Sequence, residues 1–223
     1  MKFNLRARLA AEFTGTAFLV AAVIGSGIMG ERLAGGSLAI ALLANTIATG
    51  AALAALILTF APISGAHLNP AVTLCDAMQR GIAWPGAAAY ILAQCAGGIV
   101  GAIVAHLMFG LRWYSFSTHS RHGWMQALSE FVATFGLLLV IWGCSRFKSQ
   151  ALPFAVASYI MAAYWFTAST SFANPAVTVA RALSDTFAGI RPADVPAFIG
   201  AQIAGAVSAT FLFAWLVRNA SGS

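Results

Sequence analysis

Long runs of apolar residues, separated by short polar or charged segments, make up most of this 223-residue chain. Six of the runs come close to the roughly 20 residues that an α-helix needs to cross a bilayer. They predict spans at about 9–29, 38–61, 86–108, 125–145, 151–170 and 195–217. Two shorter apolar stretches, about 69–79 and 175–184, predict re-entrant half-helices, which occur where they line a protein-filled or water-filled interior. The pattern therefore predicts an all-α integral membrane protein.

Composition and charge agree with a membrane protein. Hydrophobic residues make up 60% of the chain and charged residues only 8%, too few to cover a soluble domain of this size. Membrane topology explains the net charge of +6, because the sequence has no basic face for a nucleic acid. With the N-terminus inside, the inner side holds Lys2, Arg6, Arg8, Arg80, Arg146, Lys148 and Arg218, and the outer side holds Arg32, Arg112, Arg121, Arg181 and Arg191. This bias predicts a multi-pass protein with cytoplasmic termini.

The tripeptide Asn-Pro-Ala occurs twice inside apolar stretches, each time followed by Val-Thr. The copies are Asn69, Pro70 and Ala71, and Asn174, Pro175 and Ala176. Asn suits the cap of a helix and Pro its first position, so each copy predicts the start of a half-helix. The free N–H groups, the positive dipole end and the Asn amide would face a polar cavity. Two such ends meeting in a pore would bind the oxygens of a neutral solute and repel cations.

The two halves of the chain carry the same signals in the same order. Glu12 and Glu130 each lie in the first span of a half and precede an Asn-Pro-Ala-Val-Thr. Gln94 and Gln202 then lie in the Gly-rich third span. Three spans per half invert the second copy, which puts the functional site near the midplane. We expect one transmembrane channel domain over 1–223, with repeats at about 1–110 and 120–218.

Carboxylates inside a membrane mark a function or a partner. If Glu12 and Glu130 carried protons, the chain would be a proton-coupled transporter. Their repeat symmetry favours a scaffold, in which each carboxylate accepts hydrogen bonds from backbone N–H groups that the broken segment of its own half leaves free. Gln94 and Gln202 are interpreted in the same way, and His67 is expected to bond locally or to line the inner mouth.

Candidate metal ligands are few. The three cysteines are odd in number and lie in or beside apolar spans, so we expect no disulfide framework and favour inert packing over a site for a soft metal or metalloid. They are Cys75, Cys95 and Cys144. His119 and His122 have the spacing of metal ligands, but their loop favours a solvated outer vestibule. We expect no metal, no cofactor and, for want of a catalytic motif, no enzyme.

The chain resembles the aquaporin and aquaglyceroporin family over essentially its whole length. The resemblance rests on both Asn-Pro-Ala boxes, on the repeated Glu and Gln, and on the lead-in Ser64-Gly65-Ala66-His67-Leu68. It implies a pore of six helices and two half-helices, four pores to a homotetramer in the lipid bilayer, and passive passage of water or small uncharged solutes.

The expected selectivity filter departs from the family pattern. Most members have Arg directly after the second Asn-Pro-Ala, where this chain has Val177. Spacing to the motifs gives the remaining filter positions as Thr49, Ala162 and Ser171. None of the four carries a ring or a charge, so the resemblance implies a constriction wider than that of a water channel. A slip of one residue in the fifth span would bring Tyr164 or Trp165 into the filter instead.

A filter with Val after the motif resembles a bacterial branch associated with arsenic resistance. The resemblance implies a channel of the bacterial inner membrane for glycerol-like polyols, for arsenous acid and related neutral arsenicals, and for water. Two alternatives stay open: a water-selective aquaporin, and the proton-coupled transporter that would use Glu12 and Glu130.

Arg181 is a further candidate pore residue. It lies seven residues after Asn174, so both side chains project from nearly the same face of the second half-helix. It is one turn beyond Val177 and long enough to extend back towards the filter. We expect it to place a charge in the outer vestibule that repels cations without narrowing the pore. An exposed pair with Asp185, or a tie to the loop before the last span, are the alternatives.

Overall fold

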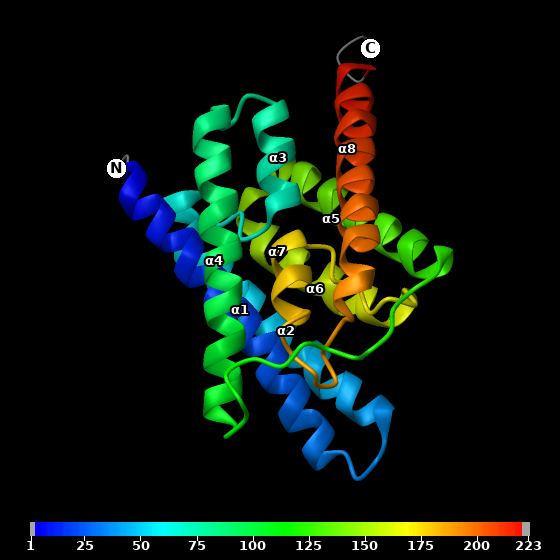
Figure 1. The fold of residues 1–223 in the computed structure, drawn as a ribbon. Helices are drawn as coiled ribbons and strands as arrows, with labels where there is room; N and C mark the ends of the chain where they lie inside the picture. The colour runs from blue at the N-terminus through cyan, green and yellow to red at the C-terminus, as the bar shows by residue number, and fades with distance from the viewer. Residues whose placement is uncertain (1–2, 220–223) are drawn as a thin grey trace.

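The computed structural model describes residues 3–219, which form helices and contain no strand. Figure 1 shows two short helices, α3 and α7, surrounded by the long ones. The helices are α1 Leu5–Leu33, α2 Leu38–Ser64, α3 Pro70–Met78, α4 Trp84–Met108, α5 Trp124–Phe147, α6 Leu152–Phe166, α7 Pro175–Arg181 and α8 Val195–Asn219. Two 3-10 turns, Ser149–Ala151 and Pro192–Asp194, precede α6 and α8.

Among residues 3–219, five segments are long and apolar enough to cross a membrane: α1, α2, α4, α5 and Pro192–Arg218, which covers all of α8 except Asn219. The fifth expected span, 151–170, is shorter than predicted, because α6 ends at Phe166 after 15 residues. The backbone of Thr167 is extended (φ −111°, ψ 141°), and Thr170 has a φ of +60°. The second re-entrant segment therefore begins before residue 170. Its half-helix α7 likewise ends at Arg181, short of the expected 184.

The two halves pack alike. Helix α1 packs against α4 and α2, as α5 packs against α8 and α6. Glycines make the closest crossings possible, since a Cβ atom on Gly97 would collide with the carbonyl oxygen of Phe13, and one on Gly205 with that of Phe131. Gly101, one turn after Gly97, lies equally close to α1. Small residues at helix crossings are typical of membrane bundles, where packing replaces the hydrophobic effect.

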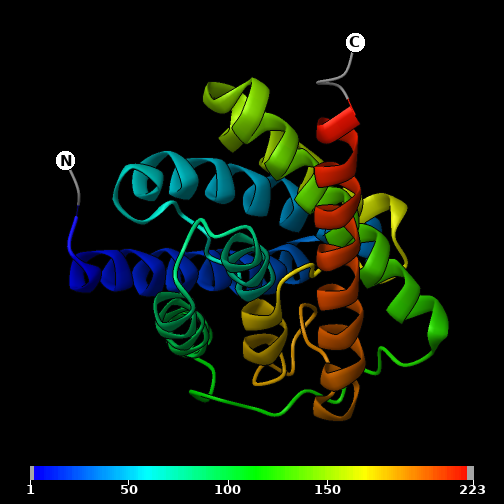
Figure 2. The ribbon, with the colours of Figure 1, turned by 90° about the horizontal axis from the view of Figure 1, so that it is seen from above.

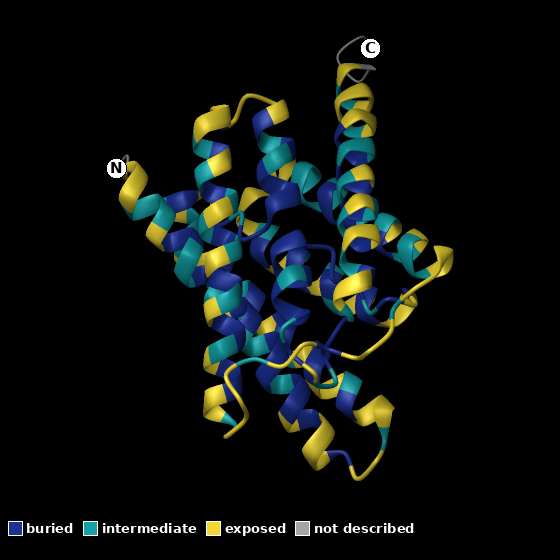
Figure 3. Cartoon of the chain, in the orientation of Figure 1, coloured by how far each residue is buried: buried dark blue, intermediate teal, exposed yellow. Residues whose placement is uncertain are grey.

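Burial follows the same plan. In Figure 3 the interior, including the half-helices, is buried, and exposed residues cover the outer faces of the long helices and the loops. Many exposed side chains are large and apolar, among them Leu92 and Trp124, which are 72% exposed. Apolar outer faces suit contact with lipid rather than with water.

The loop 109–123 lies at the end of the molecule away from both chain ends. Figures 1 and 2 show it running from the end of α4 past α7 and α8 to the start of α5. Backbone bonds from Ser115 to Leu183 and from Ser117 to Ala182, at 2.9 and 3.0 Å, join it to the segment after α7. The loop therefore forms a fixed cover over that end of the second half-helix.

Candidate functional site

Both half-helices begin at an Asn that caps them. Asn69 Oδ1 accepts from the N–H of Ala71 at 2.9 Å. Asn174 Oδ1 accepts from the N–H groups of Ala176 and Val177, at 3.0 and 3.3 Å. Pro in the first helical position lacks an N–H that would need a partner. The two turns are thus built alike, with the Asn oxygen used for the cap and the amide nitrogen left to point elsewhere.

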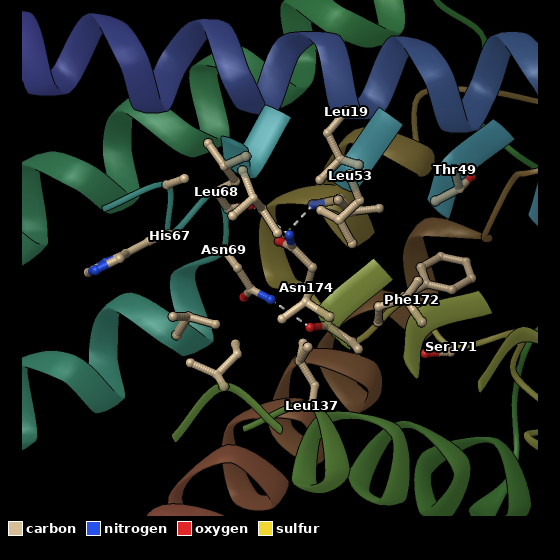
Figure 4. Close-up of a pocket in the computed structure, with 18 of the residues that line it drawn as sticks. Leu19, Thr49, Leu53, His67, Leu68, Asn69, Leu137, Ser171, Phe172 and Asn174 are labelled. Atoms are coloured by element: carbon tan, nitrogen blue, oxygen red, sulfur yellow. Dashed lines mark hydrogen bonds between the residues drawn. The ribbon is translucent and has the colours of Figure 1, made fainter. Parts of the chain in front are cut away.

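The amide nitrogens of the two Asn residues join the halves of the chain. Asn69 Nδ2 donates to the carbonyl oxygen of Ala173, and Asn174 Nδ2 donates to that of Leu68, both at 2.8 Å. Figure 4 shows Asn69 and Asn174 next to each other near the centre of the cavity, with dashed lines marking hydrogen bonds of the residues drawn. An amide nitrogen carries two hydrogens. Each Asn therefore keeps one N–H for the cavity that both residues line.

A buried carboxylate holds the lead-in to the first half-helix. The carboxylate of Glu12 accepts from the backbone N–H groups of His67 and Leu68, at 3.0 and 2.7 Å. The Ser64 hydroxyl and the Gln94 amide donate to the same group, at 2.6 and 2.8 Å. Glu12 thus has four donors and no free lone pair facing lipid.

The second half repeats this arrangement. The carboxylate of Glu130 accepts from the backbone N–H groups of Phe172 and Ala173, both at 2.9 Å. The amide of Gln202 donates to it at 2.6 Å and also to the hydroxyl of Thr178. Both carboxylates are 0% exposed. Charge-assisted bonds of this kind offset the cost of burying an ionised group.

The lead-ins have an unusual backbone. Ala66 and Leu68 have φ values of +48°, and Ser171 and Ala173 have values of +49° and +48°. These residues stand three and one positions before each Asn, so the conformation repeats in both halves. Side chains with a Cβ disfavour it, and it persists where surrounding bonds hold it. The bonds to the two carboxylates supply that restraint.

A cavity of about 180 Å³ runs past the Asn pair. In Figure 4 His67 lies on one side of the pair, and Thr49, Ser171 and Phe172 lie on the other. Leucines such as Leu19, Leu53 and Leu137 form the wall between these ends. The cavity therefore combines an apolar wall with a few fixed polar groups, as sites for small molecules do.

Three of the four expected filter residues line this cavity: Thr49, Ser171 and Val177. The fourth placement needs correction, since Ala162 is exposed on the outer face of α6. Tyr164 lines the cavity from α6, with its hydroxyl 3.4 Å from Thr49 Oγ1. Positions 162 and 164 differ by about 200° around a helix, so they face opposite directions. Buried residues recur every three to four positions along α6, and this set includes Ile160 and Tyr164 but not Ala162. Counting a fixed number of residues back from Asn174 ignored this helical period.

Arg181 lies inside the protein at the C-terminal end of α7. It is 2% exposed, and it lines both the central cavity and a second cavity of about 500 Å³, here called the vestibule, which His119 and Arg121 of the loop 109–123 also line. Its Nε donates to the carbonyl oxygen of Ala188, so it does tie the segment before α8. Asp185 instead accepts from the backbone N–H and the hydroxyl of Thr118, at 2.8 and 3.0 Å. The alternative of an exposed pair with Asp185 is therefore wrong.

The remaining candidate ligands lie apart. His67 Nδ1 is 3.1 Å from Thr73 Oγ1, and His67 Nε2 is 3.8 Å from Asp76. His119 lines the vestibule, whereas His122 contacts Ser120 at 2.7 Å. Within residues 3–219, no three His, Cys, Asp or Glu side chains come together as metal ligands would, and the three cysteines are free.

Comparisons with known proteins agree with this geometry. Residues 1–150 match the family described as major intrinsic protein. The chain is 52% identical over 219 residues to Aquaglyceroporin AqpS of Rhizobium meliloti (strain 1021), covering 98% of this chain and 94% of the relative. It is 32% identical to Aquaporin NIP1-4 of Oryza sativa subsp. japonica, covering 98% and 79%. The X-ray structure of the aquaglyceroporin from Plasmodium falciparum shares the fold, with a TM-score of 0.77 at 20% identity over 94% of this chain and 96% of that one.

These matches bear on what the protein is. The family consists of channels, which confirms the expectation that the chain is not an enzyme. The fold of the chain, with re-entrant half-helices among apolar spans, is likewise the predicted one. The chain belongs to the major intrinsic protein family of multi-pass membrane channels.

Proposed function

We propose that the chain is a passive channel for small uncharged solutes, namely glycerol-like polyols, arsenous acid and related neutral arsenicals, and water. The observation that carries the proposal is the cavity at the Asn pair. Asn69 and Asn174 each offer it an N–H beside apolar walls. A solute with several hydroxyl groups replaces its lost hydration by accepting from these donors, and a cation does not. The relative with 52% identity carries the name aquaglyceroporin, which supports polyols as the substrate class.

The filter of this channel is proposed to consist of Thr49, Tyr164, Ser171 and Val177. The hydroxyl groups of Thr49, Tyr164 and Ser171 offer hydrogen-bond donors and acceptors. Val177 leaves room where most family members have Arg. Arg181 is proposed to add the charge of the outer vestibule. It is long, buried and common to both cavities, which supports a role at their boundary.

A water-selective channel is the second candidate, and one observation favours it. Tyr164 and Arg181 both line the central cavity, so a ring and a guanidinium stand close to a filter expected to have neither. If these two side chains set the width, only water would pass at speed.

A proton-coupled transporter finds less support. Glu12 accepts four hydrogen bonds and Glu130 accepts three, and both carboxylates are fully buried. A proton carrier needs an acceptor that can be released, whereas protonation here would disrupt bonds to the backbone of the lead-ins. We propose that both carboxylates are scaffold.

We also propose that the chain is one channel domain with repeats at about 1–110 and 120–218, that it forms a homotetramer, and that it lies in a bacterial inner membrane with cytoplasmic termini. The matched hydrogen bonds of Glu12 and Glu130 support the repeat. The exposed apolar outer faces support burial in lipid or against further copies. Chemical cross-linking in membranes tests the tetramer, and protease access to tags at each end tests the orientation.

Proteoliposome swelling tests the function. Purified protein in vesicles is mixed with a glycerol, urea or sucrose gradient, and light scattering follows the volume. Glycerol-driven swelling above that of empty vesicles supports the wide channel, and water flux without glycerol flux supports the narrow one. Uptake that depends on an imposed proton gradient would support the transporter.

A further inference from the structure

Two arginines from distant parts of the chain meet at the ring of Phe172. The guanidinium carbon of Arg181, at the end of α7, lies 3.4 Å from the ring centroid. That of Arg121, in the loop 109–123, lies 5.0 Å from the same centroid. The ring stands two residues before Asn174, and its backbone N–H is fixed by Glu130. The Phe172 ring thus forms cation–π contacts with two guanidinium groups at the outer end of the central cavity.

Neither arginine forms an ion pair with a carboxylate among residues 3–219. Arg121 donates to the carbonyl oxygens of Gly189 and Ser169, at 2.8 and 3.0 Å. Arg181 Nη1 is buried and has no hydrogen-bond partner among the described residues. A buried donor without a partner costs free energy, and an oxygen atom that enters the cavity would remove that cost.

Both arginines line the outer vestibule, which is also lined by acidic side chains. Glu31 and Asp185 line the same space, so the vestibule as a whole does not trap anions. Burial and the two nearby arginines lower the pKa of His119 below its ordinary value of 6.5, so this lining residue is neutral at pH 7. Near the ring of Phe172, these two guanidinium groups outnumber the one neighbouring carboxylate, that of Glu130, which accepts from the backbone N–H of Phe172. Positive potential is therefore concentrated at the entrance to the central cavity.

We propose that Arg121 is a specificity-determining residue of the channel, which acts together with Arg181 across Phe172 to accept solute oxygens and to repel cations. The inference rests on the proposed function, because it assigns a second arginine to the filter of that same pore. A loop residue thereby supplies part of the charge that position 177 lacks.

Arg121 also ties the loop to the re-entrant segment, and this structural role must be separated from a role in selectivity. Its bonds to the Gly189 and Ser169 carbonyls require donors but no charge. Burial lowers the pKa of Arg121 to about 10, so the guanidinium stays charged at neutral pH. A neutral variant with a donor therefore removes the charge, and a lysine variant keeps the charge but loses the planar fork of donors.

The experiment compares Arg121→Gln, Arg121→Lys and the matched control Arg112→Gln in proteoliposomes. Arg112 lies in the same loop, carries the same charge and has an exposed side chain. Potassium leak and the ratio of glycerol to urea flux are measured for each variant. We expect Arg121→Gln to raise potassium leak about tenfold, which corresponds to about 1.4 kcal/mol of the barrier. Arg121→Lys should keep cations out but change the glycerol-to-urea ratio, and Arg112→Gln should change neither quantity.

Wild-type vesicles in the same series distinguish a failure of the proposed channel function from a failure of the role proposed for Arg121. If the wild type passes no neutral solute, the proposed function fails. If it passes glycerol, and Arg121→Gln matches it in both potassium leak and flux ratio, the role of Arg121 is overturned. Should Arg121→Gln fail to assemble, Arg121→Lys decides alone, since an unchanged glycerol-to-urea ratio would leave Arg121 with a structural role only.

Discussion

The side-chain amide of Asn69 donates to the carbonyl oxygen of Ala173 at 2.8 Å, across 104 positions of the chain. The same bond runs in reverse from Asn174 to Leu68. Asn suits this task because its oxygen caps its own half-helix while its nitrogen binds the other half. The two Asn residues therefore line the cavity and also join the two halves of the chain by hydrogen bonds.

Asn174→Asp should weaken cation exclusion. The carboxylate keeps the cap on Ala176 but cannot donate to Leu68, and it brings a negative charge to the positive end of α7. We expect potassium conductance in proteoliposomes to rise, together with a loss of stability of about 1–3 kcal/mol from the unpartnered carbonyl. Asn174→Ala serves as the control, because it also loses the bond to Leu68, and the cap bonds in addition, without adding charge. Equal conductance in the two variants would contradict an electrostatic barrier at this position.

Val177→Arg should narrow the pore. Val177 is 4% exposed, lines the central cavity and lies one turn before Arg181 on α7. A second guanidinium there would bring bulk and charge together, so glycerol flux should fall at least about tenfold, a change of about 1.4 kcal/mol in the barrier. Water flux should fall less. Val177→Leu adds bulk without charge and should have a small effect. Full glycerol flux through Val177→Arg, at equal protein content, would remove residue 177 from the filter.

Gly97→Ala should destabilise the bundle. Its Cβ would collide with the backbone carbonyl oxygen of Phe13, which cannot move aside as a side chain can. Overpacking of this kind costs about 1–3 kcal/mol or more. Gly200 in α8 has nothing within 4 Å of an added Cβ, and Gly200→Ala should be neutral or stabilising by about 0.5–1 kcal/mol. Thermal unfolding in detergent compares the two, and equal melting temperatures would refute the close crossing.

Glu130→Gln should reduce stability and leave the transport mechanism unchanged. The new amide would place a donor against the amide of Gln202 while its oxygen still accepts from Phe172 or Ala173. We expect a loss of about 1–3 kcal/mol in the free energy of unfolding, with normal flux per folded channel. Uptake measured with and without a proton gradient checks this. A wild type driven by the gradient and a variant uncoupled from it would show that Glu130 carries protons.

Much of the site could be predicted from local signals. Asn suits the cap of a helix and Pro its first position, so the half-helix starts at Pro70 and Pro175 could be predicted from two residues each. A buried Glu needs donors, and the broken segment of the same half has free N–H groups, so the bonds of Glu12 and Glu130 follow from pairing requirements alone.

The sequence by itself determined the class of the protein, the number of apolar runs and the place of both motifs, because hydropathy, capping and repeat order act over a few residues. Only the tertiary structure decided which side chains share the cavity. Tyr164 faces it and Ala162 does not, because a shift of two residues turns a helical side chain to the opposite face. Arg121 and Arg181 meet at Phe172 because the loop 109–123 is bonded to the segment after α7, a contact between parts of the chain about 60 residues apart that no local pattern specifies.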